Sequence, residues 1–163
     1  MKNLFFTKMT AVAMALLILV AFTPTRVEAA VPIPDLTPQQ IEATIEDAFT
    51  GLVTFDVARV INHFADDAVL EDPVGTPPMQ GKQAIAAYLA SFPTLFNSMK
   101  LYSLDIKPGG QEAAVTWRLR FTTKTAHTFF LEGIGHFRFN QEGKIQAEKE
   151  FFDLAYFLEQ LQK

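Results

Sequence analysis

The feature that most limits the fold of this 163-residue chain is a period-two pattern in its second half. Apolar and polar residues alternate strictly over residues 115–122, and a similar alternation resumes over residues 128–139. Successive side chains of a β-strand point to opposite faces, so each run predicts a half-buried strand with one apolar face. That face carries Val115, Trp117, Leu119 and Phe121 in the first run, and Phe129, Leu131, Gly133, Gly135, Phe137 and Phe139 in the second.

Helical spacing dominates the first half of the chain. Thr37, Pro38 and Gln40 predict a helix start, with Thr as the N-cap and Pro at the first helical position. Apolar residues then recur at helical spacing from Ile41 to Leu52. We expect two more helices, from about residue 56 to 64 and over residues 82–92, the latter ended by Pro93, and a closing helix over residues 154–161. Further strands are expected over residues 68–72, 101–107 and 144–152, so helices followed by antiparallel strands predict an α+β domain.

The N-terminus has the pattern of a secretory signal. Lys2 and Lys8 precede an apolar run over residues 9–22, and Val27-x-Ala29 matches a signal-peptidase site. An uncleaved anchor is the alternative, but these 14 residues fall short of the ~20 that span a bilayer. We therefore expect a signal peptide over residues 1–29, an arm over residues 30–36 and one domain over residues 37–163, exported to the periplasm or secreted. Contact with a membrane is expected only through the cleaved signal.

Charge and composition exclude several classes of protein. Without residues 1–29 the chain would keep 11 of its 14 basic residues and 17 of its 18 acidic ones, which disfavours a nucleic-acid partner. There is no cysteine, so no disulfide can hold the fold, and the 16 phenylalanines must supply the core and can line an apolar cavity. The three histidines have no metal-ligand spacing, and no cofactor-binding motif is present, so we expect neither metal nor cofactor.

Asp72 is the candidate catalytic residue. It should share one strand face with Ala68 and Leu70, which places a carboxyl group in apolar surroundings. Burial disfavours the charged form and raises the pKa of such a group, which suits a general base near neutral pH. The alternative is that Asp72 caps the turn that starts at Pro73.

Several short motifs resemble one known family. They are Ala65-Asp66-Asp67-Ala68, Glu71-Asp72-Pro73-Val74-Gly75, Gly81 with Ala84-Ile85, and His136-Phe137-Arg138-Phe139-Asn140. Together they resemble the steroid Δ5-isomerase, or SnoaL-like, branch of the nuclear transport factor 2-like superfamily. The resemblance implies an α+β cone in which N-terminal helices pack inside a strongly bent, mostly antiparallel sheet. It also implies that Asp72 is the base that shuttles the proton.

The resemblance fails where the family holds the substrate oxygen. The family's donor Asp directly precedes the His-Phe-Arg-Phe motif, and this chain has Gly135 there. The family's donor Tyr corresponds to Ala48 or Phe49, neither of which has a hydroxyl group. Losing one such donor costs about 10²–10³ in rate. We therefore expect weak steroid isomerisation, and a gain from the Gly135→Asp substitution.

The remaining candidates would form a ligand pocket. The predicted lining is Tyr88, Trp117, Leu119, Phe121, Gly135, Phe137 and Phe139. Tyr88 could be a packed core residue or a replacement donor, and Gly133 and Gly135 could bend the sheet or leave room for a ligand. Arg118, Arg120, Glu132, His136 and Arg138 fall on the other face, which predicts a solvated surface with cross-strand ion pairs or a dimer face.

Three functions remain open from the sequence. The first is an isomerase-like enzyme in which Asp72 moves a proton on a hydrophobic carbonyl substrate. The second is a protein that binds a hydrophobic small molecule, such as a steroid or carotenoid, without turnover. The third is a dimerisation module with a filled core. In each case we expect a homodimer.

Overall fold

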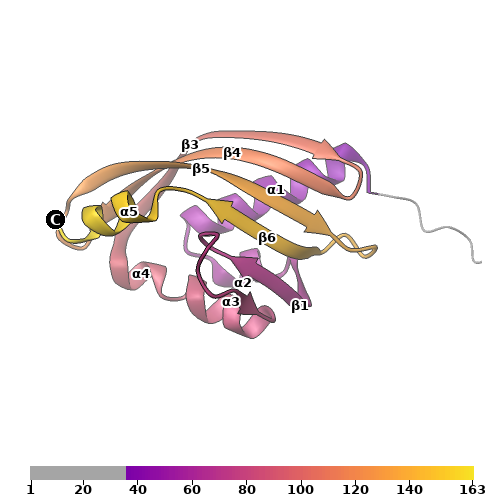
Figure 1. Ribbon diagram of the computed structural model, residues 1–163, viewed down its shortest axis with the longest axis horizontal. Coiled ribbons are helices and arrows are strands. Elements are labelled where there is room, and N and C mark those ends of the chain that lie inside the picture. Colours follow the sequence, from indigo (N-terminus) through magenta and orange to yellow (C-terminus); the bar gives the residue numbers. More distant parts are fainter. Residues whose placement is uncertain (1–35) are drawn as a thin grey trace, which may run out of the picture. The chain divides into compact units, whose positions relative to one another are not determined.

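The computed structural model describes residues 36–163, and Figure 1 shows their arrangement. The predicted signal peptide over residues 1–29, and the arm over residues 30–36 apart from its last residue, lie outside the described residues. Residues 36–163 form five helices: α1 (Pro38–Val53), α2 (Val57–Ile61), α3 (Lys82–Leu89), α4 (Phe92–Leu95) and α5 (Leu154–Leu161). Six strands form one sheet: β1 (Phe64–Glu71), β2 (Met79–Gln80), β3 (Phe96–Gly109), β4 (Glu112–Thr123), β5 (Thr128–Phe139) and β6 (Ile145–Phe151).

Helix α1 begins as the sequence predicted. The Gln40 backbone N–H donates to Thr37 Oγ1 at 3.3 Å, and the Thr37 backbone N–H donates to Gln40 Oε1 at 2.8 Å. This capping box satisfies two backbone donors that the helix itself leaves free. It fixes the start of the helix whose Ile41, Ile45 and Phe49 are buried in the core.

Two predicted boundaries were wrong. The helix expected over residues 82–92 ends at Leu89, and Pro93 lies in the first turn of the separate helix α4. Proline is tolerated there because the first helical residues have no intrahelical partner for their N–H groups. The strand β1 begins at Phe64, which we had assigned to the preceding helix; α2 ends at Ile61, and Phe64 pairs with Ile145 of β6.

The sheet has the order β2-β1-β6-β5-β4-β3, and only the β1–β6 pair is parallel. It bends strongly around α1, as Figure 1 shows, and remains unclosed. The register sets Val115 opposite Gly135, Trp117 opposite Gly133 and Phe121 opposite Phe129. The alternation predicted for β4 and β5 is therefore confirmed, and their apolar faces form one concave wall of the core.

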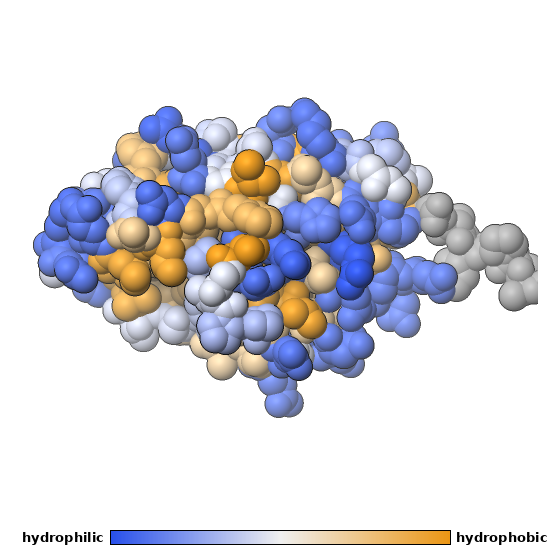
Figure 2. Space-filling view, viewed as in Figure 1, coloured by the Kyte–Doolittle hydropathy of each residue, from blue (hydrophilic) through white to orange (hydrophobic). Residues whose placement is uncertain are grey.

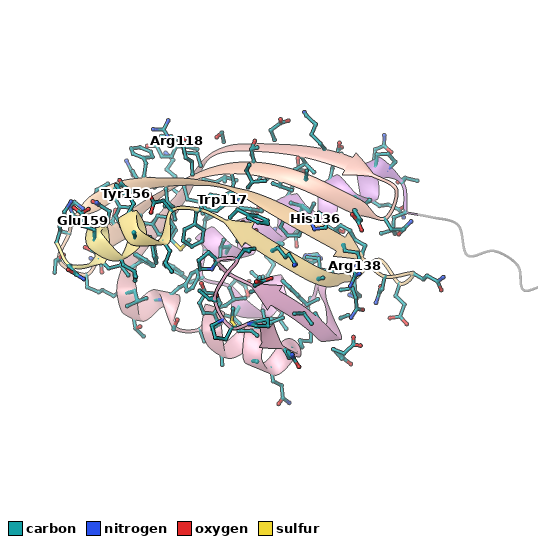
Figure 3. All side chains as sticks on the ribbon, viewed as in Figure 1. Trp117, Arg118, His136, Arg138, Tyr156 and Glu159 are labelled. Atoms are coloured by element: carbon teal, nitrogen blue, oxygen red, sulfur yellow. The ribbon has the colours of Figure 1, made fainter. Side chains whose placement is uncertain are left out.

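The outer face of the sheet has fewer ion pairs than we expected. The Arg118 guanidinium lies 4.5 Å from the centre of the Phe130 ring, and Phe130 meets Tyr102 edge-on at 4.9 Å. Two cross-strand pairs are of the expected type, but only one involves a predicted residue: His136 Nε2 lies 2.9 Å from Glu112 Oε2, and Lys149 Nζ lies 3.3 Å from Glu71 Oε2. In Figure 3 Arg118 projects from the outer side of the sheet, whereas its neighbour Trp117 lies on the inner side. The expected homodimer stays a prediction.

Several large apolar side chains of this domain are exposed. They include Ile134, Phe151, Tyr156 and Leu158, and Figure 2 shows apolar side chains gathered over α5 and over the neighbouring part of the sheet. No helix within residues 36–163 is long and apolar enough to cross a bilayer.

A β-bulge in β6 decides which side chains of that strand face the core. Phe139 pairs with Ile145, but Arg138 pairs with Ala147, so Gln146 is an extra residue. Such an insertion shifts the alternation by one residue and re-aims the side chains that follow it. Ile145 is buried before the bulge, and after it Glu148 and Glu150 lie opposite Phe137 and Gly135 on the inner face.

Neighbouring side chains occupy the space beside the two glycines of β5. A Cβ atom at Gly133 would overlap the Trp117 indole ring and lie 2.7 Å from the Phe151 carbonyl oxygen. A Cβ atom at Gly135 would lie 2.7 Å from Glu150 Oε1 and 2.7 Å from Phe137 Cε2. On the inner face of the sheet the two glycines therefore make room for Trp117 and Glu150, and neither leaves space for a ligand on that face.

This packing predicts that Gly133→Ala destabilises the protein. The added methyl group meets backbone and a packed ring, so we expect a loss of about 1–3 kcal/mol in the free energy of unfolding. Gly109→Ala is the matched control, because a Cβ atom there has no neighbour within 4 Å. Urea unfolding of both variants measures the difference, and equal midpoints would contradict the packing described for Trp117.

Candidate functional site

A cavity of about 90 Å³ lies between the inner face of the sheet and the helices. Most of its lining is apolar and much of that is aromatic. The aromatic residues are Phe49, Phe64, Tyr88, Phe92, Phe96, Trp117, Phe121, Phe137, Phe152 and Phe157. Among residues 36–163, the only ionisable carboxyl groups in the lining are those of Asp72, Glu148 and Glu150, and no Lys, Arg or His of these residues lines the cavity.

Asp72 follows directly after β1, and a side chain of α3 binds its carboxyl group. The Tyr88 hydroxyl donates to Asp72 Oδ2 at 3.0 Å. Burial raises the pKa of Asp72 to about 6, and the hydrogen bond from Tyr88 only partly offsets this. The direction is the one the sequence predicted for a carboxyl group on an apolar face.

The turn after Asp72 is held by other groups. The Gly75 backbone N–H donates to Glu71 Oε1 at 3.2 Å, and the Thr76 hydroxyl donates to the Pro73 carbonyl at 2.7 Å. Asp72 is therefore not the side chain that caps this turn. The Val74 backbone N–H donates to the Glu150 carbonyl at 2.7 Å, which ties the loop after Asp72 to β6.

Two acidic residues of the site were missed from the sequence. Glu148 and Glu150 lie on the inner face of β6, and the Trp117 indole Nε1–H donates to Glu150 Oε2 at 2.6 Å. Glu150 is 5% exposed. Glu148 lies on the same face of β6 as Glu150, and both carboxyl groups line the cavity. Neither of the two alternating sets of side chains in Gln146-Ala147-Glu148-Lys149-Glu150 is apolar, so the sequence does not indicate which set faces inward. The bulge decides this.

The carboxyl groups of β6 hold their protons more strongly than Asp72 does. Burial raises the pKa of Glu150, and the nearby charge of Asp72 raises it further, whereas the Trp117 bond lowers it. Burial, followed by the charges of Glu150 and Asp72, raises the pKa of Glu148 well above its usual value. Burial and the Asp72 charge likewise raise the pKa of Tyr88, which stays a neutral donor. With a pKa of about 8 against about 6, the Glu150 carboxyl group keeps its proton at a pH at which Asp72 has lost its own.

The structure brings together most of the residues that the sequence proposed. Asp72, Tyr88, Trp117, Leu119, Phe121 and Phe137 all line the cavity. Gly135 and Phe139 face the same interior but are not part of the cavity wall, because the Glu150 carboxyl and the Phe137 ring cover Gly135. Contact of any of these residues with a ligand stays a prediction.

The expected gain from Gly135→Asp does not fit this geometry. Its Cβ atom alone would come within 2.7 Å of Glu150 Oε1, so a new carboxyl group could be placed only by displacing the one already there. Ala48 and Phe49, the positions that lack the family's hydroxyl donor, do line the cavity.

The comparisons with known proteins agree with this fold. Residues 45–148 match the family described as "SnoaL-like domain", and the chain belongs to this family of the nuclear transport factor 2-like superfamily. A putative polyketide cyclase from Xanthomonas campestris pv. campestris superposes with a TM-score of 0.69 at 16% identity, covering 76% of this chain and 97% of that one.

Two further solved structures are similar. A nuclear transport factor 2-like protein of unknown function from Burkholderia pseudomallei K96243 has a TM-score of 0.66 at 18% identity, covering 76% of this chain and 98% of that one. TerC, co-crystallised with polyporic acid, has a TM-score of 0.66 at 18% identity, covering 76% of this chain and 99% of that one. At these identities the likeness establishes the fold.

The raised pKa values predict that the protein loses stability as pH rises. A buried carboxyl group whose pKa is higher in the folded state stabilises that state only while it is protonated. For Asp72, the rise from 3.8 to about 6 corresponds to about 3 kcal/mol, lost as pH increases from about 4 to 6. Glu148 and Glu150 extend the loss to higher pH, because burial raises their pKa values too.

Urea unfolding between pH 4 and pH 9 tests this. Asp72→Asn should flatten the profile below pH 6, and Glu150→Gln should flatten its upper part, because neither amide can be ionised. Glu132→Gln, which changes an exposed carboxylate on the outer face, is the control and should follow the wild type. A wild-type profile that rises from pH 4 to pH 6 would contradict burial of the Asp72 carboxyl group.

Proposed function

We propose that this protein catalyses proton transfer on a neutral, hydrophobic carbonyl compound, with Asp72 as the general base. The observation that carries the proposal is the Asp72 carboxyl group at the wall of an apolar cavity, with a pKa near 6 and a single Tyr88 hydrogen bond. A base with such a pKa is ionised at neutral pH and still binds the proton that it removes.

The cavity indicates what kind of molecule it would accept. The described part of the chain gives its lining three carboxyl groups and no cationic side chain, so it disfavours an anionic substrate. Its volume of about 90 Å³ is less than the roughly 150 Å³ of a protein cavity that accepts benzene. We infer that it holds the reacting end of a substrate, and that a four-ring steroid is a poor substrate.

The names of similar structures support a carbonyl substrate. The Xanthomonas campestris structure is described as a putative polyketide cyclase. Polyketides carry repeated carbonyl groups whose neighbouring carbon atoms lose protons readily. In the proposed reaction Asp72 removes such a proton to leave an enolate, and then returns it to the same or another carbon atom.

Isomerisation of cyclohex-3-en-1-one to its conjugated isomer tests the role of Asp72. The probe is a single ring, and the product is followed by its ultraviolet absorbance. Asp72→Asn should lower kcat/KM by about 10²–10⁴, the usual contribution of a general base. The wild-type rate should fall as pH decreases through about 6, because protonated Asp72 cannot accept a proton.

Asp66→Asn is the control for this experiment, because the Asp66 side chain is 99% exposed and lies outside the cavity. It should keep the wild-type rate. Equal rates for the wild type and Asp72→Asn would overturn the proposal.

A ligand-binding protein is the second candidate. It is favoured by the absence of hydroxyl and carboxyl side chains at Ala48, Phe49 and Gly135, the positions of the family's donors. Tight binding of an apolar ketone, with no turnover by the wild type, would support this function in place of catalysis.

We also propose that the chain is exported and cleaved after Ala29 or Ala30. The support is the Lys2/Lys8 charge, the apolar run over residues 9–22 and the small residues at the site. N-terminal sequencing of the native protein should begin at Ala30 or Val31. Ala29→Lys should accumulate with its N-terminus intact, because a bulky charged residue blocks the cleavage site. Native protein that begins at Met1 in the cytoplasmic fraction would contradict export.

A further inference from the structure

Trp117, Glu148 and Glu150 form an arrangement that the sequence motifs do not explain. The Glu150 carboxyl group lies in the space that the missing Gly135 side chain leaves, and the Trp117 indole N–H holds its Oε2 atom at 2.6 Å. The Trp117 ring lies over Gly133, so both glycines of β5 serve this one arrangement. Glu148 lies on the same strand face as Glu150, and both line the cavity beside Asp72.

We propose that Glu148 and Glu150 act as an acid pair that protonates the carbonyl oxygen of the substrate while Asp72 removes the neighbouring carbon proton. Trp117 is the positioning residue of this pair. The inference rests on the proposed function and narrows its substrate class to ketones that form an enol.

The proton transfers balance without any other reactant. In the first step the C–H bond breaks and its proton goes to the Asp72 carboxylate, while the C–H electron pair becomes the new C=C bond. The carbonyl electron pair takes the proton of the acid pair, so the enol O–H forms and the pair gains one negative charge. In the second step Asp72 returns its proton to a carbon atom, and the enol returns its proton to the pair.

The surroundings of the pair keep it protonated while Asp72 is ionised. The titratable groups that face it are the Asp72 carboxylate and the Tyr88 phenol, and no cationic side chain lines the cavity. A nearby negative charge disfavours ionisation of a second carboxyl group, and burial adds to this effect. The Trp117 hydrogen bond acts in the opposite direction, because an N–H donor stabilises the carboxylate form.

The pH dependence of kcat/KM for cyclohex-3-en-1-one tests the acid pair. The wild type should give a bell-shaped profile, with a rise as Asp72 loses its proton and a fall at higher pH as the pair loses its own. Glu150→Gln should lower the maximum about 10²-fold and shift or remove the fall, because an amide cannot transfer the proton. Trp117→Phe should move the fall to higher pH, an effect that a purely structural role would not give.

The outcomes separate this inference from the proposed function. Glu132→Gln is the control and should keep the wild-type profile. If the wild-type rate depends on Asp72 but Glu150→Gln keeps both rate and profile, the acid pair is overturned and the base stands.

If the wild type does not turn the probe over, the infrared stretch of the bound cyclohexanone carbonyl decides the question. A shift to lower frequency that disappears at high pH in the wild type, and is smaller in Glu150→Gln, supports the contact with the pair. The absence of a shift overturns it.

Discussion

The hydrogen bond from the Trp117 indole to the Glu150 carboxyl group is the interaction on which the rest of the site depends. A carboxyl group buried to 5% exposure is costly unless its polar atoms have partners. Trp117 supplies such a partner, because its indole N–H donates to Glu150 Oε2 at 2.6 Å. The bond also connects β4 to β6 across β5, which is why the intervening strand has glycine at residues 133 and 135.

The same arrangement makes the stability of the fold depend on the protonation of its buried carboxyl groups. Asp72, Glu148 and Glu150 all have pKa values raised by burial, so each carboxyl group lowers the stability of the fold when it loses its proton. A core filled with apolar side chains would avoid this cost. The protein keeps three such groups around one cavity, and their different proton affinities are what an acid and a base acting together require.

Part of the site was open to prediction because its signals are local. Tyr88 lies on the apolar face of a helix, so helical spacing placed it at the interior, and the Glu71-Asp72-Pro73-Val74-Gly75 motif at the end of a strand favoured the same place for Asp72. The capping box of α1 and the alternation in β4 and β5 were equally readable. Pro93 was misread because a proline that ends one helix and a proline that starts the next give the same local signal.

The sequence by itself determined the α+β class, through the order of its helical and strand patterns, and the inner face of β4 and β5, through the periodicity within each strand. For Asp72 the strand spacing left a turn cap open, and the surrounding motif favoured an interior carboxyl group. Only the tertiary structure decided that Glu148 and Glu150 belong to the site. The bulge at Gln146 reverses the alternation of β6, and a bulge is defined by pairing with a strand that lies elsewhere in the sequence. Likewise, Gly135 is an isolated oddity in the sequence, and its meaning emerges only when β6 brings the Glu150 carboxyl group against it.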